Sequence, residues 1–393
     1  MLAGIDSAPM LVRVETWSAI NTGTRNLDGL ARQAEALADA FAELPGKVSL
    51  EEPEPVTAMD ASGAEVELGH GNHLLLRVRP EASRRYLLTG HMDTVFPADH
   101  DFQQTRWIDT ETVNGPGTAD MKGGIAVILA ALTAFESSQA AKAVGYDVMI
   151  NSDEETGSLS SANLISWLAQ GKMAALTYEP SALPDGTLAH ARGGSGNYSV
   201  AIVGRSAHAG RNPRDGRNAI VAAASVALGL KEIECADIPI NPARIEGGSA
   251  NNVVPDHAVL RFNIRPRTQA AADSFPALLK ALLDDVWSKY EVSIRLHGGI
   301  TRPPKPVDAK AQKLFDLVRA CGEELGQAIR WQPSGGVCDG NNIAACGIPV
   351  VDTMGVRGGA IHSPEEFMIV PSLKERAELS ALVLHRLAKG EMM

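Results

Sequence analysis

Short apolar segments of strand length alternate with segments of helical spacing along most of this chain. The strand-length segments lie at residues 47–50, 73–78, 86–89, 147–151, 174–178 and 349–352. Apolar residues recur with the period of a helix at 27–44, 124–135, 159–168, 309–325 and 372–387. Because strands that alternate with helices form mostly parallel sheets covered on both faces, the pattern predicts a doubly wound α/β domain.

The middle of the chain, residues 193–299, follows a different pattern. We expect strands at 197–203, 258–264 and 292–297, and helices at 218–233 and 270–290. The order strand, helix, two strands, helix, strand, in which the strand before 258–264 has no assigned bounds, is typical of a two-layer α+β domain whose sheet carries two helices on one face. Glycine pairs at 193–194 and 298–299 flank it as hinges. The chain is therefore predicted to have one α/β domain, residues 1–192 and 300–393, interrupted by a smaller α+β domain.

Charge and cysteine content exclude several functions. The 36 basic and 47 acidic residues give a formal charge of −11, which argues against nucleic acid or an anionic membrane as a partner. The four cysteines, Cys235, Cys321, Cys338 and Cys346, form no CxxC pair that would indicate a disulfide framework or a thiolate zinc site. The N-terminus lacks a signal-peptide pattern, and we find no apolar run near the roughly 20 residues of a membrane span. We therefore expect a cytoplasmic protein.

Acidic and imidazole side chains follow the predicted strands. His91 and Asp93 follow the strand at 86–89, Glu154 and Glu155 follow 147–151, and Glu179 follows 174–178. The last strand leads through a glycine-rich loop to His362, and Asp120 directly precedes the helix at 124–135. Loops from the carboxyl ends of parallel strands converge on one site, and imidazoles and carboxylates are the usual zinc ligands where thiolates are lacking. These positions predict a metal site.

Each of these residues also has a simpler interpretation when it is taken alone. Asp120 suits the N-cap of the following helix, His91 suits a hydrogen-bonded core histidine, and the Glu154–Glu155 pair suits a solvated loop. The metal interpretation is favoured because all of these side chains fall at a strand end or a helix start. Together they also form a chemically matched ligand set.

Five stretches, taken in order, resemble one family. They are GHMDTVFP (90–97), NGPGTADMKGG (114–124), NSDEETGS (151–158), GRSAHAG (204–210) and GGAIHSPEE (358–366). They are similar to the motifs of the co-catalytic zinc peptidases, which include aminoacylases, acetylornithine and succinyl-diaminopimelate deacylases, tri- and dipeptidases, and bacterial glutamate carboxypeptidase. Glu179, where the family has Asp or Glu, resembles the glutamate carboxypeptidase and deacylase branches. The resemblance implies that residues 193–299 form a lid that also mediates a homodimer.

The resemblance also implies roles for individual residues. His91 and Glu179 would bind one metal ion, Glu155 and His362 a second, and Asp120 would bridge them. Two divalent ions are implied, with zinc expected and cobalt or manganese as alternatives. Asp93 would orient His91, and Glu154 would act as the general base.

Further residues would act on the substrate. His208 would stabilise the oxyanion in a neighbouring subunit's site; alternatively it is a loop histidine. Arg265 and Asn252 would grip a terminal carboxylate, and Gly359 would leave room for the substrate backbone; alternatively Arg265 lies on a strand surface and Asn252 forms a turn. Cys338 replaces a Ser or Thr that is common in the family, which leaves the preferred acyl group open.

The predicted function is hydrolysis of an amide or peptide bond beside a free carboxylate, as in glutamate carboxypeptidase. An N-acyl amino-acid deacylase, acting on a small molecule or short peptide, is the alternative within this class. A metal-binding dimer without catalysis is the alternative of another class, against which Glu154 argues. A phosphate cradle at GPGTADMKGG is disfavoured, because it lacks both the P-loop ending and the GxGxxG spacing.

Overall fold

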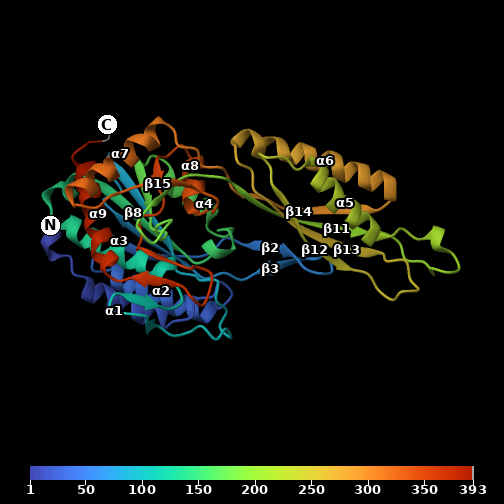
Figure 1. The fold of residues 1–393 in the computed structure, drawn as a ribbon, viewed down its shortest axis with the longest axis horizontal. Helices are drawn as coiled ribbons and strands as arrows, with labels where there is room; N and C mark the ends of the chain where they lie inside the picture. The colour runs from blue at the N-terminus through green and yellow to red at the C-terminus, as the bar shows by residue number, and fades with distance from the viewer. Residues whose placement is uncertain (392–393) are drawn as a thin grey trace. The chain divides into compact units, whose positions relative to one another are not determined.

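The computed structural model describes residues 1–391 and divides into two compact units (Figure 1). Unit 1 comprises Met1–Glu54, Gly69–Arg192 and Val307–Met393, and unit 2 comprises Pro55–Leu68 and Gly193–Pro306. Unit 2 thus contains a short segment from the first part of the chain, residues 55–68, which the sequence analysis did not assign to it.

A six-stranded sheet forms the centre of unit 1, in the order β1-β4-β8-β5-β9-β16. Its strands are β1 (Lys47–Glu51), β4 (His73–Val78), β8 (Gly145–Asn151), β5 (Arg85–His91), β9 (Ala174–Thr177) and β16 (Val350–Val351). The pairs β8–β5, β5–β9 and β9–β16 are parallel, whereas β1–β4 and β4–β8 are antiparallel. The mostly parallel sheet predicted from the sequence is confirmed, with an antiparallel edge.

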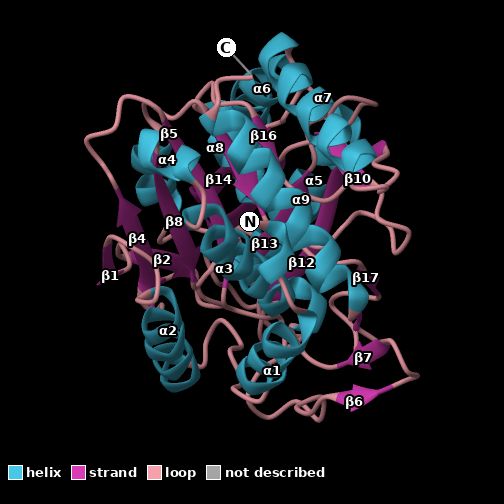
Figure 2. Cartoon of the chain, turned by 90° about the vertical axis from the view of Figure 1, so that its left-hand side faces the viewer, coloured by secondary structure: helices cyan, strands magenta, loops and turns pink. Residues whose placement is uncertain are grey.

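Helices cover both faces of this sheet (Figure 2). One face packs against α1 (Ser7–Ser18), α2 (Leu27–Phe41), α3 (Gly123–Glu136), α7 (Ala309–Glu324) and α9 (Pro371–Ala388). The other packs against α4 (Ala162–Ala169) and α8 (Asp339–Ala345). Successive strand residues alternate between the two cores, as Leu87 and Leu88 do, because side chains of a strand point to opposite faces.

Helix α1 is absent from the sequence-based prediction. It begins after Asp6, whose side chain accepts a hydrogen bond from the Ala8 amide and caps the helix. Helix α3 was predicted and is nearly all apolar. Contrary to the expectation from the sequence, the stretch Thr118–Glu136 is long and apolar enough to cross a membrane by length and composition alone, but 89% of its most apolar window is buried inside the protein. Burial of this extent is typical of a core helix.

A second, four-stranded sheet in unit 1 joins the loops on which the site depends. Its order is β17-β18-β7-β6, with bounds Gly358–Gly359, Phe367–Ile369, Thr112–Asn114 and Arg106–Trp107. A parallel pair, β10 (Leu188–Arg192) and β15 (Trp331–Ser334), completes the strands of this unit. Because β7 pairs with β18, the segment before α3 lies beside the segment after His362.

Unit 2 is a two-layer α+β structure. Its sheet has the order β12-β13-β11-β14, formed by Ile240–Gly247, His257–Ile264, Ser195–Val203 and Ser293–Arg302. Helices α5 (Ala219–Ile233) and α6 (Gln269–Tyr290) share its apolar core. The hairpin β2–β3 (Val56–Met59 and Glu65–Leu68) joins this unit because Met59 packs with Ala201 and Val259 of the sheet.

Candidate metal centre

The candidate site lies where β5, β8 and β9 end at the same edge of the parallel part of the sheet. Parallel register aligns His91 with Asn151 and Thr89 with Thr177. His91, the turn at Glu154–Glu155 and Glu179 therefore lie close together at this edge. Asp120 precedes α3, and His362 follows β17 with a left-handed φ of 64°.

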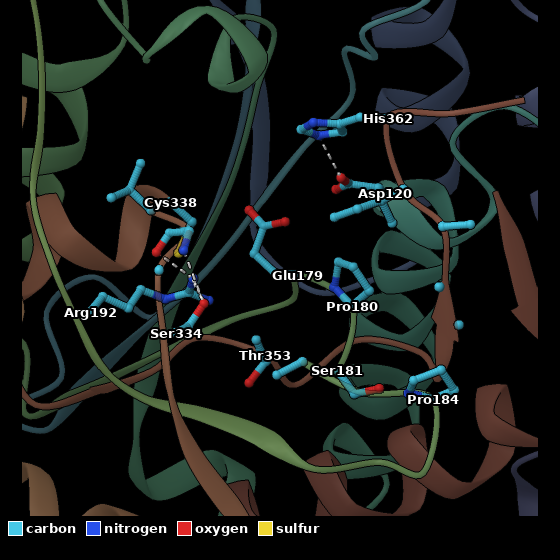
Figure 3. Close-up of a pocket in the computed structure, with 18 of the residues that line it drawn as sticks. Asp120, Glu179, Pro180, Ser181, Pro184, Arg192, Ser334, Cys338, Thr353 and His362 are labelled. Atoms are coloured by element: carbon cyan, nitrogen blue, oxygen red, sulfur yellow. Dashed lines mark hydrogen bonds and ion pairs between the residues drawn. The ribbon is translucent and has the colours of Figure 1, made fainter. Parts of the chain in front are cut away.

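Five side chains at this edge form two groups that could each hold a metal ion: His91, Asp120 and Glu179, and Asp120, Glu155 and His362. In the first group, His91 Nε2 lies 3.1 Å from Asp120 Oδ1 and 3.6 Å from Glu179 Oε2. In the second, His362 Nε2 lies 3.3 Å from Asp120 Oδ2 and 3.1 Å from Glu155 Oε2. Asp120 thus contributes one oxygen to each group, and Figure 3 shows its contact with His362.

The distances between the atoms of each group match those expected when the atoms bind the same metal ion. Ligand atoms about 2.0–2.1 Å from a tetrahedral zinc are roughly 3.3 Å apart, close to the separations seen in both groups. Glu179 Oε1 is buried and has no hydrogen-bond partner among the described residues, although a buried carboxylate oxygen normally has one. An ion at this position would satisfy that oxygen.

The electrostatics also favour cations at this place. Hydrogen bonds to Asp120 and Glu155 raise the pKa of His362 to about 11. Burial opposes charge on His91, but the carboxylates of Glu179, Asp120 and Asp93 outweigh it and hold the pKa of His91 well above its usual value. Burial and the charge of Asp120 raise the pKa of Glu155 to about 7. Crowded carboxylates of this kind are stabilised by bound positive charge.

Asp93 contacts both the imidazole of His91 and the turn that carries Glu154. Its Oδ1 lies 3.3 Å from His91 Nδ1, and its backbone carbonyl lies 3.0 Å from the same nitrogen. The carboxylate also accepts hydrogen bonds from the amides of Glu154 and Glu155, at 3.1 and 3.2 Å, and from the Thr24 hydroxyl at 2.7 Å. The sequence predicted only the contact of Asp93 with His91 and contains no signal for Thr24, which lies 69 residues away.

Glu154 lines the same pocket as Asp120, Glu155, Glu179 and His362. It belongs to neither of the two ligand groups found among residues 1–391. Asp93 holds its backbone amide, so its side chain extends from an anchored turn next to Glu155 of the second group. The Glu154 carboxylate therefore stays outside both groups, whereas its neighbour Glu155 belongs to one of them.

Close backbone packing holds the start of α3 against the chain that precedes Glu179. A Cβ atom built on Gly124, at the start of α3, would lie 2.1 Å from the carbonyl oxygen of Tyr178. Only glycine permits this approach. The helix that follows Asp120 is thereby pressed against the residue that precedes Glu179.

Glu366, which the sequence analysis missed, connects the loop of His362 to the loop of Asp120. It is 1% exposed, and its carboxylate accepts hydrogen bonds from the amides of Gly117, Ala119 and Asp120 at 3.1, 2.9 and 3.0 Å. Burial raises the pKa of Glu366 to about 8, an effect that these three amides oppose. Its position in the motif GGAIHSPEE was the signal in the sequence that could have indicated it. The sequence does not distinguish Glu366 from the adjacent Glu365, however.

We expect Glu366→Gln to weaken metal binding by about 10–100-fold, the usual effect of losing a group that supports a ligand. The glutamine NH₂ group would face an amide N–H where the carboxylate now accepts, so the Asp120 loop would shift. The exposed neighbour Glu365 provides a matched control, because Glu365→Gln leaves these contacts intact. Competition with a metal-chelating dye measures both variants, and equal metal affinity in the two would contradict this role of Glu366.

The pocket beside the ligands belongs to unit 1 and has a volume of about 550 Å³. Its walls are formed by residues 180–182, 184, 332–338 and 358–362, together with Arg192, Thr353 and Phe367 (Figure 3). Gly359 lies in this wall, next to Phe367. Cys338 is 2% exposed and also lines the pocket, and burial holds the pKa of its thiol well above the usual value.

The remaining predicted site residues lie in unit 2. His208 is exposed, and its Nδ1 accepts hydrogen bonds from the amides of Gly210 and Arg211 at 3.1 and 3.2 Å. A neutral imidazole held this way carries its proton on Nε2, which can donate. Asn252 lies beside this loop, because its carbonyl accepts from the Ala209 amide at 2.9 Å.

Arg265 lies at the other end of β13 from Asn252 and His208. Asn252 precedes the strand and Arg265 follows it, so eight residues of β13, roughly 25 Å, separate them. Arg265 Nε donates to Asn263 Oδ1 at 2.8 Å. Within a single chain, Asn252 and Arg265 are therefore too far apart to hold the same carboxylate.

This chain is similar to a known peptidase family and to individual bacterial enzymes. Residues 87–386 match the sequence profile of "Peptidase family M20/M25/M40". The chain is 27% identical over 396 residues to carboxypeptidase G2 of Pseudomonas sp. (strain RS-16), covering 99% of this chain and 92% of that protein. It is 26% identical over 347 residues to a succinyl-diaminopimelate desuccinylase of Magnetococcus marinus, covering 82% and 88%.

Solved structures share the fold. A tripeptidase from Staphylococcus aureus superposes with a TM-score of 0.74 at 24% identity, covering 98% of this chain and 99% of that one. An M20 family metallo-carboxypeptidase from Sulfolobus solfataricus superposes with a TM-score of 0.70 at 16% identity, covering 97% and 99%. Both units therefore have counterparts in proteins of known structure.

Proposed function

Because this chain belongs to the peptidase family M20/M25/M40 and is a metallohydrolase, we propose that it hydrolyses an amide or peptide bond next to a free carboxylate. The observation that carries the proposal is the pair of ligand groups that share Asp120, with Glu154 on the wall of the same pocket. His91 and Glu179 would hold one ion, and Glu155 and His362 the other.

The residues of the chain divide the reaction between them. Two divalent ions, with zinc expected, would polarise the scissile carbonyl and lower the pKa of the attacking water. Glu154 takes the proton of that water and later gives it to the leaving nitrogen. Asp93 keeps His91 and the Glu154 turn in fixed orientation. His208 donates to the oxyanion through Nε2.

The substrate is proposed to be an N-acyl amino acid or a short peptide with a terminal carboxylate. Arg265 suits this carboxylate, because a guanidinium can donate two parallel hydrogen bonds. Similarity to carboxypeptidase G2 over nearly the whole chain favours glutamate-type substrates, and similarity to a desuccinylase favours N-acyl amino acids. A panel of both, assayed on metal-reconstituted protein, separates them, and no turnover on either would contradict the proposal.

A homodimer through unit 2 is proposed for two reasons. Asn252 and His208 lie at the opposite end of β13 from Arg265, so a second chain is needed to bring both ends to one substrate. In addition, α6 and the edge strand β14 border an apolar groove of about 480 Å³. Trp287 and Leu296 in this groove are 59% and 46% exposed, and exposed apolar patches of this kind mark interfaces.

We expect Trp287→Glu to convert the dimer to a monomer, because it places a charge in the proposed apolar interface. Analytical ultracentrifugation measures the mass. Val12→Glu is the matched control, because Val12 is 61% exposed but lies on α1 of unit 1. A monomeric wild-type protein, or a dimer that survives Trp287→Glu, would contradict the proposed interface.

A mixing experiment tests whether His208 acts across the dimer. Glu154→Gln and His208→Ala are each expected to be inactive alone. If His208 serves the neighbouring subunit, a mixed dimer contains one site with both an intact Glu154 and an intact His208, so mixing restores activity. If each His208 serves its own subunit, every site lacks one of the two groups and mixing restores nothing.

A further inference from the structure

The pocket beside the ligand groups contains a buried arginine whose charge is already neutralised. Arg192 is 8% exposed and lies in the pocket wall (Figure 3). Its Nε and Nη2 donate to the two carboxylate oxygens of the fully buried Asp352, at 2.8 and 3.3 Å. Its Nη1 donates to Ser334 Oγ at 3.2 Å and to the Gly336 carbonyl at 2.9 Å. A guanidinium has five N–H donors, and all three nitrogens of this one are engaged within the protein.

The rest of the wall offers uncharged donors but no unpaired cation to a negatively charged group. Among the described residues that line the pocket, Arg192 and His362 are the only basic side chains, and His362 belongs to a ligand group. The hydroxyl of Ser181 donates to the Leu183 carbonyl, whereas that of Thr353 accepts from the Ala189 amide and keeps its own proton, and Gln332 adds an uncharged amide. The remaining surface is largely apolar, with Pro180, Pro184, Pro333, Val337, Ile361 and Phe367.

Cys338 makes this wall less polar still. The thiol is a soft, weakly hydrogen-bonding group, and burial keeps it protonated. Glu154, a carboxylate on the same pocket, would repel a second carboxylate placed beside it. A negatively charged group bound here would therefore lose its water without meeting an unpaired cation of the wall, which is unfavourable.

From these contacts we propose that the pocket of unit 1 receives the acyl half of the substrate, and that this half must be uncharged and mainly apolar. The inference rests on the proposed function, in which the amino-acid half carries the carboxylate and needs a cation outside this pocket. It selects neutral acyl amino acids and excludes dicarboxylic acyl groups such as succinyl. The pocket volume of about 550 Å³ lies within the range of small-molecule sites and leaves room for an aryl or branched acyl group.

The test compares acyl groups of similar size on one amino acid, the one turned over best in the substrate panel. Pentanoyl and succinamoyl are neutral, and succinyl is charged. We expect kcat/KM for the pentanoyl substrate to exceed that for the succinyl substrate by at least about tenfold, with succinamoyl between them. Dissociation constants measured by calorimetry on Glu154→Gln should follow the same order, which separates binding from hydrolysis.

A substitution in the pocket wall should increase hydrolysis of the charged substrate. Val337 is half-buried and lines the pocket, so Val337→Lys adds a free cation there, and Val337→Met is its uncharged control. The lysine variant should raise the succinyl-to-pentanoyl ratio of kcat/KM by at least about tenfold, and the methionine variant should not. A wild-type enzyme that prefers succinyl overturns the inference while leaving the proposed function intact, whereas hydrolysis of no substrate in the set overturns the proposed function.

Discussion

Replacement of Glu154 by glutamine should lower kcat by a factor of between about 10² and 10⁴, the usual contribution of a general base, while both metal ions stay bound. Glutamine has the same shape but cannot accept the proton of the water. Neither ligand group contains Glu154, and its amide, which Asp93 holds, is unchanged by the substitution. Steady-state rates and metal content by mass spectrometry measure the two effects separately.

The outcomes of this experiment distinguish three possibilities. Full turnover by the glutamine variant would mean that another group is the base. Loss of metal would mean that Glu154 is a ligand. Glu365→Gln, at an exposed position that belongs to neither ligand group, should behave as the wild type. If the wild-type protein bound metal but hydrolysed nothing, the alternative of a metal-binding dimer without catalysis would stand.

Asp120→Asn should have the largest effect on metal content, because this carboxylate contributes to both ligand groups. Its Oδ1 lies 3.1 Å from His91 Nε2, and its Oδ2 lies 3.3 Å from His362 Nε2. An asparagine offers one oxygen and one NH₂ group, so it can serve at most one of the two ions. We expect one ion or none per chain and loss of activity, measured by metal analysis after dialysis.

Comparison with single-site variants makes this prediction specific. Glu179→Gln should weaken only the ion held with His91, and Glu155→Gln only the ion held with His362. Asp109→Asn, which alters an acidic residue in an exposed loop, is the control for a change of charge. Retention of two tightly bound ions by the Asp120→Asn variant would contradict a bridging carboxylate.

Much of this architecture could be predicted from local patterns. The six strands of the central sheet and the helices α2, α3, α7 and α9 were predicted near their observed bounds, because apolar periodicity reflects which faces are buried. Helix α1 and hairpin β2–β3 were missed. The hairpin has few buried residues of its own and is stabilised by Met59 against strands about 140 or more residues later in the chain.

The amino-acid sequence alone determined which kinds of side chain stand at strand ends, and hence the class of site. Only the tertiary structure decided how those side chains are used. Asp93 also holds the Glu154 turn, Glu366 anchors the Asp120 loop 246 residues away, and Arg192 is neutralised by Asp352. These pairings join residues far apart in the chain, and no local period encodes them. They depend on which loops the sheet register brings together, and that register is set by packing of the whole domain.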